Sequence, residues 1–413
     1  MDKNCPRKKE NMPILKLKPA TKDYLWGGHR LAEEYGVEFD GPVLAEAWEL
    51  SCHPDGPSMI ANGPYAGKSL RDFIDAEGFD VLGKNCARFR EFPILTKFID
   101  AKDNLSIQVH PDNAYALKNE NQYGKTEMWY ILDAEPGAFL YYGFKEEISK
   151  EEFEERIKNN TLLEVLNAQP VKKGDAFLIK AGTLHAIGKG ILIAEIQQNS
   201  NVTYRIYDYA RRGKDGKLRD LHIAQSLDVT ERKPVEADSE GYPHIFDTDY
   251  FTVDKLNLDG KTCKEVKGHV DDASFLSVLI LDGNGTISSG EDVIGYGKGD
   301  SFFLPANSGD WKIEGVCDAL LTTIRAKENP IVAKVDLTSA SLSLVNEKEE
   351  VIASKEIETK DLTSVGQAVM AFFDEKEVPI EQVVDVQVKL DDQDQDKAQV
   401  ELTAVIPCPV HIQ

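Results

Sequence analysis

A turn, a short strand and a second turn occur together twice in this chain, at residues 173–185 and again at residues 298–310. Each copy begins with a Gly-Asp pair, continues as an apolar run and ends in a tight polar turn. A Gly-Asp turn before a strand is common in isolation, but repetition of the whole pattern predicts two related β units. The first copy ends at His185 and the second at Asp310, so we expect that only the first unit holds a metal ion.

The repeated pattern resembles the second sequence motif of cupin barrels. Between residues 250 and 325, short apolar runs alternate with Gly and Asp turns, which is typical of a β-barrel or sandwich. We therefore expect a mainly β fold with two cupin-like (jelly-roll) barrels, a small helical insert and a small α+β C-terminal appendage. Within the insert, Ser149-Lys150-Glu151-Glu152 resembles a capping box and predicts a helix that begins after Ser149. The expected division is a catalytic metal-binding barrel (13–142 and 169–235), the helical insert (143–168), a second, metal-free barrel (236–329) and the appendage (330–413).

The segment after residue 330 differs in composition from the rest of the chain. Residues 331–413 hold 17 acidic and 7 basic residues, and their one glycine is Gly366. We expect two strands (335–344 and 350–354), a helix (362–375) and two further strands (383–390 and 398–405). The acidic run 391–396 lacks the glycine and the terminal glutamate of an EF-hand loop, so we interpret it as solvated surface.

The overall charge excludes some classes of partner. The chain has 413 residues and a formal net charge of −23 at pH 7, which argues against nucleic acid or an anionic membrane, because both attract a basic surface. A pocket can be locally basic on an acidic protein, so a phosphorylated small molecule is compatible with this charge. Six cysteines are scattered without a CxxC pair, the N-terminus has no apolar signal core, and no long apolar run occurs. We expect a cytoplasmic protein with reduced thiols.

Four polar side chains on expected strands form a candidate metal site. Gln108 and His110 lie two residues apart in an apolar run, so their side chains share one face of a strand. Glu127 follows near another expected strand, and His185 follows the second turn of the first repeat copy. Each of these residues alone is more often structural or exposed, but two nitrogen and two oxygen donors together suit a borderline divalent metal such as zinc.

A second polar strand face is formed by Glu195, Gln197 and Asn199, which alternate with less polar neighbours. Such a face is either exposed to solvent or lines a polar cavity. Arg205 follows in a run of bulky residues that we expect to be half buried. A guanidinium in that position needs a carboxylate or an anionic ligand, and a structural ion pair is the simpler alternative.

Three sequence motifs together resemble the type I phosphomannose isomerases. The motifs are Gln108-Val109-His110-Pro111-Asp112, Lys125-Thr126-Glu127-Met128 and the block 185–211. Residues 14–325 are similar throughout to the short bacterial form of this family, whose members are zinc enzymes with paired cupin barrels that interconvert mannose 6-phosphate and fructose 6-phosphate. The resemblance implies one Zn²⁺ per chain, held by Gln108, His110, Glu127 and His185.

The resemblance also implies roles for residues around the metal. Arg205 matches the catalytic arginine of the family, and Lys125 and Glu195 match active-site positions. The positions that match the family's phosphate contacts are Lys97, Ser106 and Arg211. Longer family members carry a lysine where this chain has Arg211.

The chemistry implied by these residues is a proton transfer between C2 and C1 of a sugar phosphate. Arg205 can stabilise the negative charge of an enediolate, and the phosphate contacts supply binding energy remote from the reacting carbons. Glu195, a metal-bound hydroxide or a histidine could each act as the base, and the sequence leaves that choice open.

Two alternative functions are compatible with a cupin barrel. One is a protein that binds a sugar or a metal without chemistry, which would not need the lysine, arginine and glutamate set described above. The other is an iron cupin oxygenase, which usually binds its metal through three histidines, or through two histidines and a carboxylate. A glutamine ligand at Gln108 argues against the oxygenase.

Overall fold

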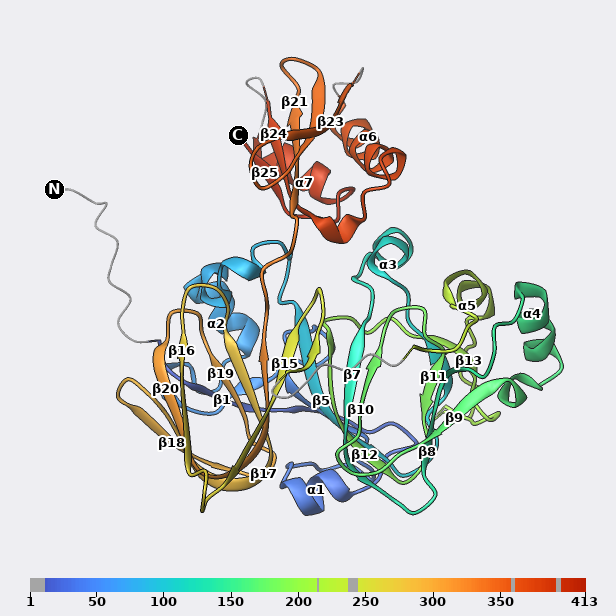
Figure 1. Cartoon of the computed structure of the whole chain (residues 1–413), viewed down its shortest axis with the longest axis vertical. Helices are drawn as coiled ribbons and strands as arrows, with labels where there is room; N and C mark the ends of the chain where they lie inside the picture. The colour runs from blue at the N-terminus through green and yellow to red at the C-terminus, as the bar shows by residue number, and fades with distance from the viewer. Residues whose placement is uncertain (1–11, 214, 237–243, 358–360, 391–394) are drawn as a thin grey trace.

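Four β-sheets organise the computed structural model, which describes residues 12–213, 215–236, 244–357, 361–390 and 395–413 (Figure 1). The chain is mainly β, as predicted, with its helices at the ends and on the outside of the sheets. Within the described ranges, every helix is too short or too polar to span a bilayer.

Two sheets form the first barrel. The six-stranded sheet runs in the order β10 (Ala176–Ile179), β7 (Glu127–Ala134), β12 (Ile191–Gln198), β5 (Ile94–Ala101), β3 (Glu46–Leu50) and β2 (Ala20–Lys22). The five-stranded sheet runs in the order β13 (Tyr204–Tyr207), β6 (Ile107–Val109), β11 (His185–Ile187), β8 (Phe139–Phe144) and β9 (Leu166–Pro170). Every residue of β12 is buried, because β5 and β7 flank it and both of its faces are covered.

The second barrel is built on one nine-stranded sheet. Its main path is β14 (His244–Asp247), β15 (Thr252–Asp259), β20 (Gly309–Thr323), β17 (Leu276–Ser289), β19 (Ser301–Leu304), β1 (Leu15–Lys18) and β4 (Met59–Ile60). Two further strands, β16 (Glu265–Val270) and β18 (Asp292–Gly297), pair with β20 and β17. A shared apolar core with the first barrel contains Phe98 of β5 and Phe303 of β19.

The N-terminal strand departs from the expected division of the chain. We expected residues 13–142 in the first barrel, but β1 pairs antiparallel with β19 of the second, with Leu15 opposite Phe303. β4 extends the same sheet by pairing with β1. The apolar pattern of residues 15–18 predicts a strand but carries no information about its partner, and β1 covers an edge of β19 that would otherwise be unpaired.

The two copies of the repeat fold alike. Gly174 and Gly299 each open the turn before a strand with a φ of 91°, a left-handed conformation that favours glycine. The ends of the copies differ. The side chain of Asp310 is 94% exposed and lies 2.6 Å from Nδ1 of His269, so it points out of the barrel, whereas His185 is fully buried.

The remaining helices lie on the outside of the sheets, and one of them, α4 (Lys150–Lys158), belongs to the insert. They are α1 (Arg30–Tyr35), α2 (Leu70–Glu77), α3 (Asn113–Glu120), α4 (Lys150–Lys158) and α5 (Ile223–Val229), with short 3₁₀ turns η1 (Gly63–Tyr65), η2 (Phe79–Leu82), η3 (Lys84–Cys86) and η4 (Leu162–Glu164). Ser149 caps α4 by accepting a hydrogen bond from the backbone N–H of Glu152, which contributes about 1 kcal/mol to helix stability.

The appendage is a separate α+β unit with its own apolar core, at one end of the molecule beside α3 (Figure 1). Its sheet runs in the order β23 (Val351–Glu356), β22 (Ser341–Val345), β21 (Ile331–Asp336), β24 (Val383–Lys389) and β25 (Val410–Ile412). Its helices are α6 (Leu362–Glu375), η5 (Ile380–Gln382) and α7 (Gln395–Thr403). The predicted helix at 362–375 is therefore confirmed, and the predicted strand at 335–344 is two strands joined by a turn.

The predicted strand at 398–405 is wrong, because most of this segment belongs to helix α7. Ala398, Val400 and Leu402 alternate with polar residues, which is the pattern of a strand. In the structure Ala398 and Leu402 are buried on one helix face, and Val400 is 71% exposed. The helix packs next to α6. Just after its end, Val405 lies against Gly366 of α6, where an added Cβ would lie 2.9 Å from Cβ of Val405. The acidic run predicted at 391–396 falls largely outside the described residues.

Candidate active site

Strand pairing brings Gln108 and His185 together. β6 pairs with β11 so that Gln108 stands opposite His185, and it pairs with β13 so that Arg205 stands opposite Gln108 on the other side. The Nε2 atoms of Gln108 and His185 are 3.4 Å apart. His110 lies just beyond β6, and its ring centroid is 4.8 Å from that of His185. The five-stranded sheet thus supplies three of the four predicted metal ligands to one place.

Glu127 reaches the same place from the six-stranded sheet. Its Oε1 atom lies 3.4 Å from Nε2 of His185, and its Oε2 atom lies 3.6 Å from Nε2 of His110. One potential ligand atom from each of these three residues lies within 4.8 Å of the others, and all three side chains are buried. Together with Gln108, these three residues form a group that we call the metal-ligand cluster. It joins the two sheets, and at this separation it can hold one small cation between them.

Backbone carbonyls fix the orientation of both imidazoles. Nδ1 of His110 lies 2.8 Å from the carbonyl oxygen of Val202, and Nδ1 of His185 lies 2.8 Å from that of Thr183. Since a carbonyl only accepts, each Nδ1 carries the proton, and each Nε2 keeps a lone pair on the side of Glu127. The lone pair of His110 has no partner among the described residues, and that of His185 lies 3.4 Å from Nε2 of Gln108. This is the arrangement by which proteins orient histidine as a metal ligand.

The electrostatics of the cluster suit a cation. Among the described residues, Nε2 of His110 and Oε1 of Glu127 are buried without a hydrogen-bond partner. Burial lowers the pKa of His110 well below its usual range and lowers that of His185 to about 4, so both rings are neutral at pH 7. Burial, followed by the negative charge of Glu195, raises the pKa of Glu127. A divalent cation would satisfy these unpartnered atoms and stabilise the buried carboxylate, so the residues fit a metal ion.

A buried chain of alternating charges continues from Glu127 across the six-stranded sheet. Nζ of Lys125 lies 2.7 Å from Oε2 of Glu127 and 3.8 Å from Oε1 of Glu195. Nζ of Lys97 lies 3.0 Å from Oε1 of Glu195 and 3.4 Å from Oε2 of Glu46. Because each lysine lies between two carboxylates, every charge in this buried row of alternating charges has an opposite partner.

Two tryptophans hold the carboxylates of this chain in place. Nε1 of Trp129 donates to Oε2 of Glu195 at 2.7 Å, and Nε1 of Trp48 donates to Oε2 of Glu46 at the same distance. Burial alone would raise the pKa of Glu195, but Lys97 and Lys125 outweigh it and lower the pKa. Glu195 is therefore an oriented, ionised carboxylate beside the metal-ligand cluster.

Ser106 links the metal-ligand cluster to Arg205. Nε of Arg205 lies 3.3 Å from Oγ of Ser106, and that hydroxyl lies 3.3 Å from Oε1 of Gln108. Arg205 is half buried, and its Nη1 donates to the carbonyl oxygen of Asp220 at 3.1 Å. A hydrogen bond from the backbone N–H of Arg205 to Nδ1 of His222 also holds the strand. Arg205 forms no ion pair within the described residues, so the structural ion pair considered above is not observed.

Asp208 joins two further arginines beside Arg205. Nη2 of Arg211 lies 2.5 Å from Oδ1 of Asp208, and Arg219 binds both carboxylate oxygens, through Nε at 2.6 Å and Nη2 at 2.5 Å. Burial, followed by the positive charge of Arg219, lowers the pKa of Arg205. Two guanidiniums thus bind one buried carboxylate, and Arg205 lies nearby without an ion pair of its own among the described residues. The three arginines around Asp208 therefore carry an excess of positive charge that suits an anionic group.

The structure divides the predicted site residues into three groups. The metal-ligand cluster holds Gln108, His110, Glu127 and His185; the charged chain holds Lys97, Lys125 and Glu195; the guanidinium cluster adjoins Ser106 and holds Arg205 and Arg211. Lys97 is enclosed by carboxylates and does not contact the guanidinium cluster. Residues that the sequence did not single out are Glu46, Trp129, Asp208 and Arg219. Arg219 could have been noticed in the sequence, because the run Arg219-Asp220-Leu221-His222 places two basic side chains and an acid shortly after the strand of Arg205.

Comparisons with known proteins identify the family of this chain. Residues 14–135 match the model of the phosphomannose isomerase type I catalytic domain, and residues 244–324 match that of the mannose-6-phosphate isomerase cupin domain. Over 299 residues the chain is 40% identical to mannose-6-phosphate isomerase of Streptococcus mutans, and the alignment covers 70% of this chain and 92% of the relative. It is 38% identical over 316 residues to mannose-6-phosphate isomerase ManA of Bacillus subtilis, and this alignment covers 74% of this chain and 97% of the relative.

Solved structures show the same fold. The crystal structure of mannose 6-phosphate isomerase from Bacillus subtilis superposes with a TM-score of 0.70 at 34% identity, covering 75% of this chain and 99% of that structure. A phosphomannose isomerase variant from Salmonella typhimurium gives a TM-score of 0.62 at 19% identity, covering 76% and 100%, and bears on the fold alone. The extent and identity of these matches show that the chain belongs to the type I phosphomannose isomerase family.

Proposed function

We propose that this protein interconverts mannose 6-phosphate and fructose 6-phosphate. The observation that carries the proposal is the metal-ligand cluster with an oriented carboxylate on one side and a guanidinium on the other. The two relatives described above are named mannose-6-phosphate isomerase, which supports the same substrate pair. A cupin that only binds a metal would not need Lys125, Glu195 and Arg205 around it.

The metal that we propose is a single Zn²⁺, held by Gln108, His110, Glu127 and His185. Two imidazole nitrogens with two oxygen donors are a set that zinc accepts. When bound, zinc would polarise the carbonyl and hydroxyl oxygens at C1 and C2 of the open-chain sugar.

The reaction moves a proton between C2 and C1 through an enediolate. We assign the handling of this proton to Glu195 and Lys125, whose carboxylate and ammonium lie 3.8 Å apart at the edge of the metal-ligand cluster. Glu195 is ionised and can take the proton from C2 and return it to C1. The adjacent ammonium of Lys125 can give a proton to the oxygen on C1 and take one from the oxygen on C2, so that both groups end in their starting states. Trp129 keeps the accepting carboxylate in one orientation.

Arg205 is assigned to the negative charge that develops on the enediolate oxygens. Its guanidinium is already oriented by Ser106 and by the carbonyl of Asp220, so no reorganisation is needed when that charge appears. We assign the substrate phosphate to Ser106, Arg211 and Lys97. Lys97 has three N–H donors, of which Glu46 and Glu195 engage two, so one remains for the phosphate.

We also propose that the enzyme works in the cytoplasm. The structure leaves the five described cysteines unpaired, and Cys52, Cys86, Cys317 and Cys408 among them are buried. Buried thiols without partners suit a reducing compartment.

An Arg205→Ala variant tests the assigned function. With fructose 6-phosphate formation coupled to a dehydrogenase readout, we expect kcat to fall on the order of 100-fold or more, because a preorganised donor for the oxyanion is lost. The metal content of the variant must equal that of the native enzyme for the comparison to hold. A near-normal kcat with intact metal would exclude this role of Arg205.

A further inference from the structure

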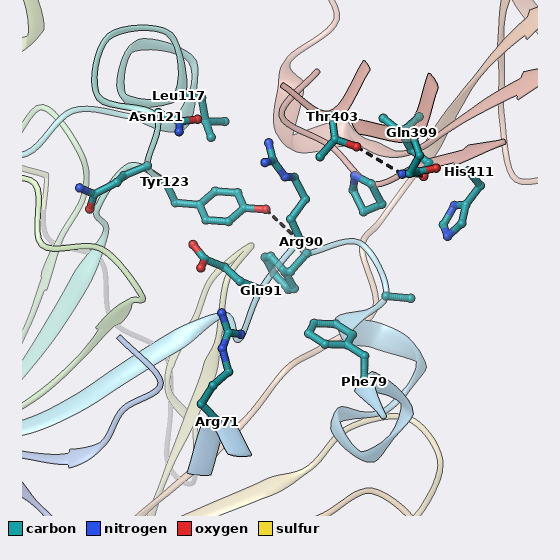
Figure 2. Close-up of a pocket in the computed structure, with 15 residues that line it drawn as sticks. Arg71, Phe79, Arg90, Glu91, Leu117, Asn121, Tyr123, Gln399, Thr403 and His411 are labelled. Carbon is teal, nitrogen blue, oxygen red and sulfur yellow. Dashed lines mark hydrogen bonds between the residues drawn. The ribbon is translucent and has the colours of Figure 1, made fainter. Parts of the chain in front are cut away.

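A crevice with a volume of about 540 Å³ lies between the first barrel and the appendage, and no residue of the metal-ligand cluster lines it. Figure 2 shows its two sides. Side chains that face it include Arg71, Arg90 and Tyr123 from the body and Gln399, Thr403 and His411 from the appendage. This volume lies within the range of small-molecule sites in proteins.

Two guanidiniums reach this crevice with most of their donors free. Nη1 of Arg90 donates to the carbonyl oxygen of Ile406 at 3.4 Å. Within the described part of the chain, the side chain of Arg90 makes no other hydrogen bond or ion pair, and that of Arg71 makes none. A guanidinium carries five N–H donors. Figure 2 shows the Arg90 guanidinium extended into the space between Leu117 and Thr403.

The other charged groups leave the crevice positive. Glu91 is the acidic residue of the lining, and it makes no ion pair within 4.0 Å among the described residues. Burial raises the pKa of Glu91, and the two arginines act in the opposite direction. His411 is held on its outer side by Asp385, with Nδ1 2.6 Å from Oδ1. Two arginines against one carboxylate make a local positive charge on a chain whose formal charge is −23.

The rest of the lining mixes apolar and polar side chains, and its polar groups suit the remainder of a hydrophilic ligand. Asn121 and Gln122 present amides from the body. On α7, Nε2 of Gln399 donates to the carbonyl oxygen of Val410 at 2.6 Å and to Oγ1 of Thr403 at 3.2 Å, which leaves the amide oxygen of Gln399 and the hydroxyl proton of Thr403 for a ligand. Such groups bind hydroxyls and amides of a ligand. We propose that the crevice is a second ligand site, which binds a small organic phosphate at Arg90, with Arg71 adding to the positive charge that attracts it, and which binds the hydroxyl-bearing remainder through Gln399 and Thr403.

The proposed site borders the segment that leads to the active site. The backbone N–H of Arg90 donates to Oη of Tyr123 at 3.0 Å, and Oγ of Ser200 donates to the carbonyl oxygen of Tyr123 at 2.7 Å. Lys125, of the buried charged chain, follows two residues later. A ligand held by both walls would therefore fix the appendage against the base of this segment, and its binding free energy would add to the stability of the full chain.

Calorimetric titration of the full chain with glycerol 3-phosphate tests the proposal. Because the active site also accepts phosphates, the native chain is expected to show two binding components. Arg71→Gln should weaken one of them about threefold to tenfold, since one of the two positive charges of the crevice is lost, and leave kcat and KM for mannose 6-phosphate unchanged. Arg156→Gln, on α4 and away from the crevice, is the matched control and should leave both components unchanged.

A second variant approaches the site from the opposite wall. Thr403→Glu places a negative charge on α7 facing the arginines, and it should weaken the same component as Arg71→Gln without changing the unfolding transition of the body. Agreement of the two variants on one component supports a shared site. Binding by the native chain, in one component or two, that both variants leave unchanged would overturn the proposal. A single component that both variants weaken would support the crevice and count only against phosphate binding at the active site.

Discussion

Gln108 and His185 stand opposite each other across the β6–β11 ladder, with their Nε2 atoms 3.4 Å apart. The amide oxygen of Gln108 is turned away and lies 3.3 Å from the hydroxyl of Ser106. A half-turn of the amide would exchange its nitrogen and oxygen, and Ser106 could keep its hydrogen bond because a hydroxyl both donates and accepts. The oxygen donor proposed for zinc is thus one side-chain rotation from the histidines, on a strand whose register is fixed.

Glu127→Gln should lose the metal while keeping the fold. Glu127 is the charged member of the metal-ligand cluster, and a neutral amide in its place removes the main attraction for a divalent cation. We expect metal affinity to fall on the order of 100-fold, measured as metal content after dialysis. Glu154→Gln, at a half-exposed position of α4 where the carboxylate pairs with Lys158, is the control and should bind metal normally. Full metal occupancy of Glu127→Gln would mean that the ion is bound elsewhere.

Lys97→Met should destabilise the protein. Removal of the ammonium leaves Glu46 and Glu195 buried with a partner missing, and breaking a buried pair in this way typically costs about 3–5 kcal/mol. The free energy of unfolding in urea measures the effect, and Lys97→Met/Glu46→Gln should recover part of it because one of the two carboxylates is neutralised. An unchanged unfolding free energy with a raised KM would show that Lys97 contacts substrate phosphate and has no structural role.

Arg219→Gln should weaken substrate binding, although Arg219 lies outside the residues that the sequence indicated. Arg219 binds both oxygens of Asp208 and lies next to Asp220, whose carbonyl orients Arg205. We expect KM for the sugar phosphate to rise about tenfold and kcat to fall less, with partial recovery in Arg219→Lys, which restores the charge without the bidentate contact. Arg212→Gln should change neither constant, because its guanidinium donates to the carbonyl of Gly216 on an exposed turn.

Asp208 should make stability depend on pH in the acidic range. Burial alone would raise its pKa, but the hydrogen bonds from Arg219 and Arg211 outweigh burial and lower it. A carboxyl whose pKa is lowered on folding stabilises the protein above its unfolded pKa, about 3.9, and this contribution is lost as the pH falls through the folded value. The difference in unfolding free energy between the native protein and Asp208→Asn should therefore be largest near neutral pH and should shrink below about pH 4. A difference that grows on acidification would contradict the ion pairing seen here.

Local sequence signals predicted local structure well. The two repeat copies, the Ser149 cap and the helix at 362–375 each depend on residues close together in the chain, and each is present. The shared strand face of Gln108 and His110 follows from the alternation of a strand, which is also local.

Features that depend on partners far away in the sequence could not be predicted from local patterns. The partner of β1 is a strand almost 300 residues away, and nothing within residues 15–18 specifies it. Glu46 and Asp208 matter because the fold places lysines and arginines around them, as only the three-dimensional arrangement reveals. The prediction of a strand in the α7 segment failed for another reason. The apolar residues of this segment fit both the two-residue period of a strand and the four-residue spacing of a helix. In the structure the segment is a helix that packs against α6.

Turnover of mannose 6-phosphate before and after removal of metal tests the central proposal most directly. The native protein is dialysed against a chelator, its metal content is measured, and fructose 6-phosphate formation is followed in a coupled assay. We expect the rate to fall on the order of 100-fold or more and to return with one equivalent of Zn²⁺ per chain, but not in Glu127→Gln. An unchanged rate in protein shown to be free of metal, or no conversion by the zinc-loaded native protein, would contradict the proposed function.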